Sequence, residues 1–179
     1  MNLRPIHSTD AAAFIRLQEQ IEADSPFALL ERGERRTGIR EQQQEIEDIL
    51  RRDNQIIFVV EDRDQLVGWL GAWGEPYRRI RHSVLIGVGV LPAYRRQGVG
   101  TQLFEALEAW AWERGLRRME LLVQTGNSPG INLYRKMGFQ IEGTKRQSYC
   151  IDGEYVDEYL MSKLLVVPEK PPHNPYPRW

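Results

Sequence analysis

Hydrophobic residues along this chain follow two patterns, a helical spacing in some stretches and short β-branched runs in others. The helical spacing, together with residues that favour helix starts and ends, predicts helices after Ser8 or Thr9, after Thr37 or Gly38, around 101–112 and around 128–137. The apolar runs predict strands at 2–6, 55–60, 66–73, 84–90, 118–123, 139–150 and 155–165. Turn sequences at 62–65 and at Asp152-Gly153 predict two antiparallel hairpins. Helices and strands therefore share one α/β domain.

The second predicted helix has a sparse apolar stripe, so we expect it to cover a sheet face rather than fill the core. Its apolar positions are Ile39, Ile46, Ile49 and Leu50. The polar stretch 23–36 that precedes it contains Pro26 and Gly33 and is predicted to be a loop.

The most informative stretch is a strand, a loop and a helix in direct succession. The run 84–90 is apolar and predicts a buried strand, in which Gly87 and Gly89 indicate a bulge or a close approach of another group. The helix that follows the loop presents one apolar face. The residues of that face are Leu103, Phe104, Leu107, Trp110 and Ala111.

The loop between them has the features of a pyrophosphate cradle. Gly98 and Gly100 let the backbone turn sharply and approach a ligand, and the next helix directs its free N–H groups at the loop. Arg95 and Arg96 add cationic donors. The nucleotide-loop pattern G-x-x-x-x-G-K-[ST] is absent, and a dinucleotide fingerprint would need a glycine where the chain has Leu103.

A second group of residues follows at Asn127-x-x-Gly130-Ile131-x-Leu133-Tyr134-x-x-x-Gly138-Phe139. Asn127 and Tyr134 are seven residues apart, which places them near one face of a helix. Asn127 can offer its amide to a peptide-like ligand, and Tyr134 can present a hydroxyl at the same cleft. The alternative interpretation is structural, with Asn127 as a helix cap and Tyr134 packed on the sheet.

These two motifs resemble those of the GCN5-related N-acetyltransferase (GNAT) family. The spacing R-x-x-G-x-G at Arg95, Gly98 and Gly100 is similar to its acetyl-CoA loop, and the second motif is similar to its N-x-x-A-x-x-L-Y-x-x-x-G-F. The resemblance covers residues 2–165, and the ending resembles the branch of small-amine, phosphinothricin-like and ribosomal-protein N-terminal acetyltransferases. It implies a mixed, mostly antiparallel sheet of about seven strands, with a splayed central pair and about four helices on its two faces.

The resemblance also implies direct transfer of acetyl from acetyl-CoA to a primary amine in a ternary complex. The acceptor would be a small or amino acid-like molecule or a protein N-terminus. Backbone N–H groups of the splayed strand would bind the thioester carbonyl, and Tyr134 would return a proton to the CoA thiolate. The cofactor-binding residues implied are Val88, Gly89, Val90, Arg95, Arg96, Gln97, Gly98, Val99, Gly100, Thr101, Asn127 and Tyr134.

One position departs from the family pattern. Relatives in this branch often carry a glutamate, a candidate general base, where this chain has Leu85. Glu120 and Glu22 are the foremost replacements, followed by Asp24, His82 or a water-mediated route, although each side chain also has a plain surface interpretation. A non-catalytic acyl-CoA-binding sensor or scaffold is the alternative function. The missing carboxylate favours that alternative, and Tyr134 argues against it.

Composition narrows the remaining choices. A net charge of −1 over 179 residues argues against a nucleic-acid binder, and three scattered histidines and one cysteine predict no metal site. The single cysteine and the lack of a long apolar run predict a protein of the cytoplasm with no membrane partner. We expect a catalytic domain over 1–165 and an extended, proline-rich tail over 166–179. The hairpin ending and the aromatic tail are compatible with a homodimer.

Overall fold

The computed structural model describes residues 1–165, so the predicted proline-rich tail lies outside the described residues. Seven strands form one sheet in the order β1-β2-β3-β4-β5-β7-β6, in which only β4 and β5 run parallel. This mixed sheet confirms the predicted fold class. The strands are β1 Asn2–Pro5, β2 Gln55–Asp62, β3 Gln65–Gly74, β4 Ser83–Val90, β5 Arg118–Gln124, β6 Gln140–Ile151 and β7 Glu154–Leu164.

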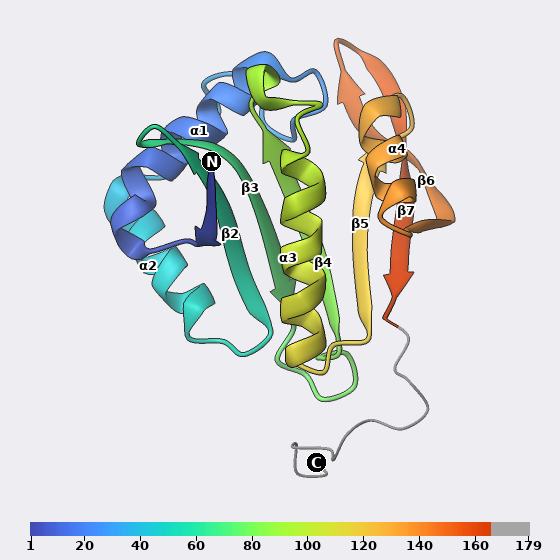
Figure 1. The fold of residues 1–179 in the computed structure, drawn as a ribbon. Helices are drawn as coiled ribbons and strands as arrows, with labels where there is room; N and C mark the ends of the chain where they lie inside the picture. The colour runs from blue at the N-terminus through green and yellow to red at the C-terminus, as the bar shows by residue number, and fades with distance from the viewer. Residues whose placement is uncertain (166–179) are drawn as a thin grey trace.

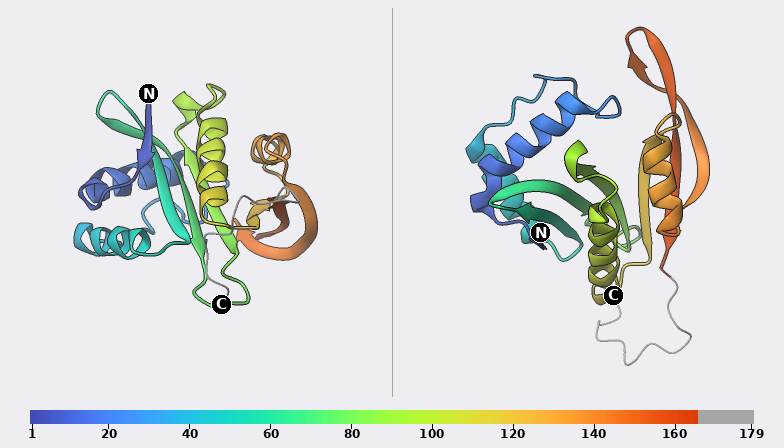
Figure 2. Two further views of the ribbon diagram at one scale, coloured as in Figure 1. Left: turned by 60° about the horizontal axis from the view of Figure 1, so that its bottom comes forward. Right: turned by 45° about the horizontal axis from the view of Figure 1, so that its top comes forward.

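Four α-helices cover the two faces of the sheet (Figure 1). They are α1 Ala11–Asp24, α2 Ile39–Leu50, α3 Val99–Glu113 and α4 Ser128–Lys136. The helices α1 and α2 lie together on one face, while α3 lies across the other (Figure 2). Strand β3 shows the division, because Trp69 contacts Phe14 of α1 whereas the neighbouring Gly68 faces Val99 of α3. Successive strand residues point to opposite faces, so both faces of the central sheet are covered.

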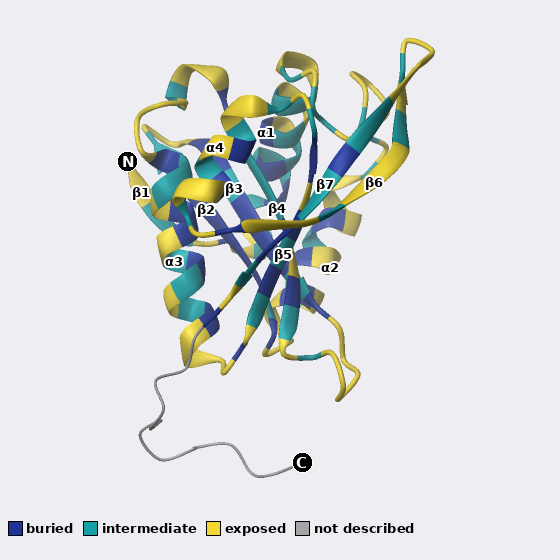
Figure 3. Cartoon of the chain, turned by 90° about the vertical axis from the view of Figure 1, so that its right-hand side faces the viewer, coloured by how far each residue is buried: buried dark blue, intermediate teal, exposed yellow. Residues whose placement is uncertain are grey.

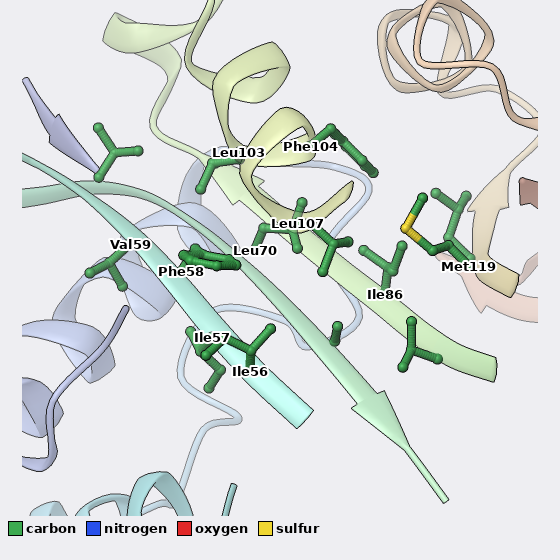
Figure 4. Packing of buried hydrophobic residues seen from close by; sticks show 14 of the residues in the cluster. Ile56, Ile57, Phe58, Val59, Leu70, Ile86, Leu103, Phe104, Leu107 and Met119 are labelled. Atoms are coloured by element: carbon green, nitrogen blue, oxygen red, sulfur yellow. The ribbon is translucent and has the colours of Figure 1, made fainter. Parts of the chain in front are cut away.

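Part of the hydrophobic core lies between α3 and the middle of the sheet (Figure 4). Leu103, Phe104 and Leu107 of α3 are fully or almost fully buried, and they pack over Leu70 and Ile86. The predicted apolar face of this helix is confirmed, although Trp110 is only partly buried. The helix ends where Gly115 adopts a φ of 68°, a left-handed conformation that suits glycine.

Two details of the first helices differ from the prediction. Residues Ser8–Asp10 form a short 3-10 helix, and the side chain that accepts hydrogen bonds there is Asp10, not Ser8 or Thr9. In α2 the buried residues are Gln42, Ile46 and Ile49, whereas Ile39 and Leu50 are exposed. The buried face of α2 therefore follows the helical spacing of residues 42, 46 and 49, and the two exposed residues are the first and the last of the helix.

Both predicted hairpins are present. Arg63 and Asp64 connect β2 to β3, and Asp152 and Gly153 connect β6 to β7, all four with positive φ. Positive φ at both central residues is the geometry that two-residue hairpins favour, because it matches the twist of the flanking strands. The β6–β7 pair forms the far edge of the sheet, where β6 is largely exposed (Figure 3).

Strand β4 is less buried than its apolar sequence suggested. Val84 and Ile86 are buried, but Leu85 is 45% exposed and the residues from Gly87 onward are only partly buried. The β3–β4 register is continuous, so the predicted glycine bulge is absent. The close approach is present instead: Trp69 and Trp73 lie against Gly87. A β-carbon at Gly87 would be 3.2 Å from each indole.

The central parallel pair is short. Strands β4 and β5 pair only at Ser83–Arg118, Val84–Met119 and Leu85–Glu120. Beyond this point β4 stays paired with β3 as far as Val90, and β5 stays paired with β7 as far as Gln124. The two halves of the sheet therefore diverge after Leu85 and Glu120, as the ribbons show in Figure 1 and in the right-hand view of Figure 2.

Candidate functional site

The divergence of β4 from β5 leaves one edge of β4 without a strand partner. Val88, Gly89 and Val90 lie in this section, still paired with β3 on their other side. Alternate backbone N–H and C=O groups of an unpaired edge point away from the sheet and are available to another chain or ligand. Such an edge can bind a peptide-like arm, which is the arrangement that the family resemblance implies for these residues.

The loop after β4 is exposed and held in place by its own side chains. Arg95 donates from Nε to the Val90 carbonyl at 3.0 Å, and Gln97 donates to the Ala93 carbonyl at 2.6 Å. Arg96 has a φ of 62°, an uncommon conformation for a residue with a side chain. Hydrogen bonds within the loop thus fix the backbone that leads into α3.

The helix α3 begins immediately after this loop, with Gly98 as its N-cap and no side chain capping it. Gln102 N–H already bonds to the Gly98 carbonyl at 3.0 Å, so the earlier N–H groups, of Val99, Gly100 and Thr101, lack helical partners. Together with the positive end of the helix dipole, they suit the phosphates of a nucleotide cofactor.

The two glycines of the loop have different structural roles. Gly98 has a φ of 85°, and a β-carbon there would meet no atom closer than 3.9 Å. Gly100 is helical, and a β-carbon there would lie 2.8 Å from Cδ2 of Leu133 on α4. The missing side chain of Gly100 makes room for α4, a packing role that the sequence did not reveal, while the approach of a ligand to both glycines stays a prediction. Gly98 is required by its backbone conformation.

The helix α4 carries both residues of the second motif. Asn127 is its N-cap, with a side-chain oxygen that accepts a hydrogen bond from Gly130 N–H at 3.0 Å. Gly130 must be small, because a β-carbon there would be 2.9 Å from the Asn127 amide. The capping interpretation of Asn127 is confirmed, and its amide nitrogen is left to interact with a ligand.

Tyr134 lies on α4 with its ring between two aromatic side chains. Phe104 of α3 and Phe139 pack against it with ring centroids 5.7 Å and 6.3 Å away. Tyr134 is 8% exposed, and burial raises the pKa of its hydroxyl to about 12. Ionisation is disfavoured because a phenolate would lose its hydration. The hydroxyl is therefore protonated at neutral pH and can act as a donor.

The candidate base Glu120 lies directly beside Leu85, at the last paired position of the two parallel strands. Cross-strand partners point to the same face of a sheet. Glu120 therefore places a carboxylate next to position 85, where this chain has leucine instead of the glutamate of the family pattern. Arg118 donates to Glu120 at 2.9 Å and also binds Glu142. A hollow of about 390 Å³ opens here, on the face opposite α3, and its lining includes Trp73, His82, Leu85, Arg118 and Glu120.

The other candidate bases are placed differently. The carboxylate of Glu22 is bound by Arg35, whose Nε lies 3.0 Å from Oε1, and the Glu22 side chain is only 8% exposed. This ion pair fastens the end of α1 to the loop over residues 25–38. Asp24 is the last residue of α1 and is exposed. His82 is exposed at the rim of the hollow beside Leu85.

Sequence reasoning missed two residues on the same face of the sheet. Gln124 at the end of β5 and Glu158 on β7 are direct cross-strand partners, 5% and 4% exposed. In the sequence, Gln124 looks like a strand end and Asp157-Glu158 like a solvated edge. The signal in the sequence is the period of two along β7, which places Glu158 on the same face as the apolar Val156 and Leu160.

Among residues 1–165, no group of three or more histidine, cysteine, aspartate or glutamate side chains is arranged to hold a metal ion. The helices of the same segment are all too short or too polar to cross a bilayer.

Comparison with known proteins agrees with this geometry. Residues 18–139 match the sequence model of the Acetyltransferase (GNAT) family. An N-alpha-acetyltransferase of Sulfurisphaera tokodaii is 34% identical over 60% of this chain and 68% of its own length. The L-amino acid N-acetyltransferase AaaT of Escherichia coli is 35% identical over 48% of this chain and 54% of its own length. The matched segment thus spans about half to two thirds of these relatives.

Solved structures match almost the whole described domain. A GNAT-family acetyltransferase from Streptococcus pneumoniae superposes with a TM-score of 0.89 at 28% identity, over 92% of this chain and 99% of its own. The acetyltransferase yncA from Salmonella typhimurium, solved with acetyl-CoA, superposes with a TM-score of 0.81 at 19% identity, over 96% of this chain and 97% of its own. The second match concerns the fold alone.

Proposed function

Because this chain belongs to the Acetyltransferase (GNAT) family and is an acetyl-CoA-dependent N-acetyltransferase, we propose that its acceptor is an α-amino group. The preferred acceptor is a small, amino acid-like molecule, and the N-terminus of a protein is the variant of the same chemistry. Two relatives support this choice by name, one as an N-alpha-acetyltransferase and one as an L-amino acid N-acetyltransferase.

The observation that carries the acetyl-CoA site is the loss of pairing between β4 and β5 after Leu85 and Glu120. The free edge at Val88, Gly89 and Val90 would hold the pantetheine arm and the thioester carbonyl. The loop from Arg95 to Thr101 would hold the phosphates, with Asn127 contributing its amide nitrogen. Acetyl-CoA supplies the activated acetyl group, and the protein supplies position and proton management.

In the reaction, the neutral amine attacks the thioester carbonyl, the C–N bond forms and the C–S bond breaks. The amine proton passes to a base or to water, and the sulfur leaves as a thiolate. Backbone N–H groups of the β4 edge would stabilise the negative charge on the carbonyl oxygen. We favour Glu120 over Glu22 as the base because Glu120 pairs with Leu85 and lines the hollow beside it. An arginine binds each carboxylate, Arg118 that of Glu120 and Arg35 that of Glu22.

Tyr134 would act on the leaving sulfur. A thiol has an ordinary pKa of about 8.5. Full proton transfer from a hydroxyl with a pKa of about 12 is therefore uphill by about 3.5 units, or about 5 kcal/mol. A hydrogen bond donated to the thiolate avoids this cost. We therefore assign Tyr134 as a hydrogen-bond donor that stabilises the thiolate. Tyr134 would give its proton to the sulfur only if a second proton source supplied Tyr134 with another proton.

The absence of a carboxylate at Leu85 supports the choice of an α-amino acceptor. An alkyl amine with a pKa of about 10.4 is almost entirely charged at neutral pH, whereas an α-amino group with a pKa of about 7.7–8.0 is partly neutral. A site with a weak or indirect base therefore works better on the second kind. The sensor alternative requires that no amine be acetylated at all.

Thiol release from acetyl-CoA across a panel of amines tests the proposal. We expect turnover with α-amino acceptors and much slower turnover with alkyl amines of the same size. Binding of acetyl-CoA without turnover on any amine would overturn the proposal and favour the sensor.

We also propose that the protein is a homodimer in the cytoplasm. The exposed apolar side chains of the terminal hairpin, Ile141 and Tyr155, support a dimer, and the exposed, unpaired thiol of Cys150 suits a reducing compartment. Light scattering after size exclusion would measure the mass, and a monomer at micromolar concentration would contradict the dimer.

A further inference from the structure

Three buried side-chain atoms lack a hydrogen-bond partner among the described residues: Gln18 Oε1, Trp69 Nε1 and Gln124 Nε2. An unpaired buried polar group is costly, so each one in a folded protein calls for an explanation. Trp69 and Gln124 lie on the two sides of the gap between β4 and β5. Gln18 belongs to α1, which covers the same face as Trp69.

The register of the sheet places the two unpaired donors at one level. Trp69 of β3 pairs with Gly89 of β4. Counted on from the pair Leu85–Glu120, Gly89 comes level with Gln124, although the strands have separated there. Gln124 in turn pairs with Glu158 of β7. Trp69, Gly89, Gln124 and Glu158 therefore form one row across the open part of the sheet.

The side chains of this row share one face. Trp69 packs on Phe14 of α1, and its Nε1 lies 2.8 Å from the place where a Gly89 β-carbon would be. On β5 the buried apolar residues Met119, Leu121 and Val123 point to the α3 side, so Gln124 points to the opposite side. The side chains of the row thus lie on the face of the sheet opposite α3. The same face carries α1 and the hollow at Glu120.

Glu158 is a buried carboxylate with little compensation. Its side chain is 6% exposed, and its ion-pair partner, Lys145 Nζ, is 3.7 Å away on a side chain that is 60% exposed. Burial raises the pKa of the Tyr149 hydroxyl, and the negative charge of Glu158 raises it further. A buried charge is expensive unless it is paired, so this position is suited to a cationic ligand. Gln124 Nε2 does not bond to Glu158 despite their pairing and has no hydrogen-bond partner, while Glu158 has the long contact to Lys145.

From this row we propose that Gln124 and Glu158 form the acceptor-recognition subsite, and that it selects an α-amino-carbonyl unit. Glu158 accepts hydrogen bonds from the acceptor ammonium as it binds, and the Gln124 amide donates to the neighbouring carbonyl or carboxylate oxygen. The ammonium then loses one proton to the base or to water, and the neutral amine attacks the thioester. The Trp69 indole N–H is a second donor from the opposite wall. An amino acid or an N-terminal residue carries this pair of groups two bonds apart, whereas an alkyl amine carries only the ammonium. The inference rests on the proposed function and assigns the residues that give it its selectivity.

The test compares L-leucinamide with 3-methylbutylamine, which is the same amine without the carboxamide group. Gln124→Met removes the amide donor at nearly constant volume, so the KM for L-leucinamide should rise about 2–12-fold while that for 3-methylbutylamine stays unchanged. Glu158→Gln removes the charge, so the KM for both amines should rise about 10–150-fold. The KM for acetyl-CoA should not change in either variant.

Glu154→Gln serves as the matched control, because Glu154 is an exposed carboxylate on the same strand. Thermal midpoints by circular dichroism check that each variant folds. Calorimetry of L-leucinamide binding to the CoA complex gives a second readout that does not need turnover. The inference would be overturned if Gln124→Met showed, for each of the two amines, the same KM and the same affinity as the wild type.

The two failures can be told apart. If the wild type acetylates α-amino acceptors but neither variant changes KM or affinity, the subsite is wrong and the proposed function stands. If no amine is acetylated but Gln124→Met and Glu158→Gln still weaken L-leucinamide binding, the subsite stands and the proposed function is wrong.

Discussion

Replacing Gly100 by valine should disturb the contact between α3 and α4 rather than block the cofactor directly. A β-carbon at this position would lie 2.8 Å from Leu133 Cδ2, whereas carbon atoms in contact are normally about 3.5–4.0 Å apart. Either the Leu133 side chain or α4 must move by roughly 1 Å. Overpacking of this kind typically costs about 1–3 kcal/mol. Valine has a higher helix propensity than glycine, but this gain offsets only about a few tenths of a kcal/mol of the cost.

The double variant with Leu133→Ala isolates the cause. Leu133→Ala empties the space that the valine needs, so Gly100→Val should cost close to nothing in that background. We therefore expect a coupling free energy of about 1–3 kcal/mol between the two positions, within the range for residues in contact. Urea unfolding of the wild type, both single variants and the double variant measures it.

Gly98→Ala is the matched control. Its β-carbon has open space, and its cost comes from a φ of 85°, which should amount to about 1–2 kcal/mol whatever residue stands at Leu133. Calorimetry with acetyl-CoA separates structure from binding. The reasoning is refuted if Gly100→Val loses the same stability in both backgrounds, or if the double variant regains stability but still fails to bind acetyl-CoA. The latter result would show that the side chain itself obstructs the cofactor.

Four further predictions concern the reaction and the loop that borders it. Tyr134→Phe should lower kcat by about 10²–10³-fold and leave acetyl-CoA affinity nearly unchanged, whereas full activity would show that the hydroxyl only packs. The pKa of Tyr134 is raised from 10 to about 12, so the unfolded state ionises first as the pH rises. The wild type should therefore lose about 2 kcal/mol more stability than Tyr134→Phe between pH 10 and pH 12, and equal losses in alkaline unfolding would contradict the burial of the hydroxyl. Because Leu85 stands in the place of a carboxylate, log(kcat/KM) for 3-methylbutylamine should rise by about one per pH unit from pH 6 to 9. A plateau near pH 7 would contradict this prediction. If the plateau disappeared in Glu120→Gln, Glu120 would be identified as an effective base. Glu22→Gln should cost about 1–3 kcal/mol in urea unfolding by breaking the ion pair with Arg35 and should leave the pH dependence of kcat/KM as it is, whereas a changed pH dependence would restore Glu22 as a base.

Local sequence signals were sufficient for most of the secondary structure, because they act over a few residues. The hairpins follow from Asp152-Gly153 and from residues 62–65, and the start of α4 follows from Asn127 and the proline after Ser128. The glycine loop and the tyrosine motif were also readable, since both depend on short, ordered spacings. These motifs led to the family, the fold class and acetyl-CoA before any contact was known.

Long-range contacts decided the properties that spacing cannot report. Only the packing shows that Gly100 makes room for Leu133 and that Arg35 occupies the carboxylate of Glu22. The same applies to Glu120, whose place beside Leu85 depends on strand register, and to Gln124 and Glu158, which become a pair only when β5 and β7 meet. The sequence alone does not distinguish a charged or polar residue that faces water from one that faces a cleft. Its environment is set by residues distant in the chain, and that environment determines whether the group remains unpaired and available to an acceptor.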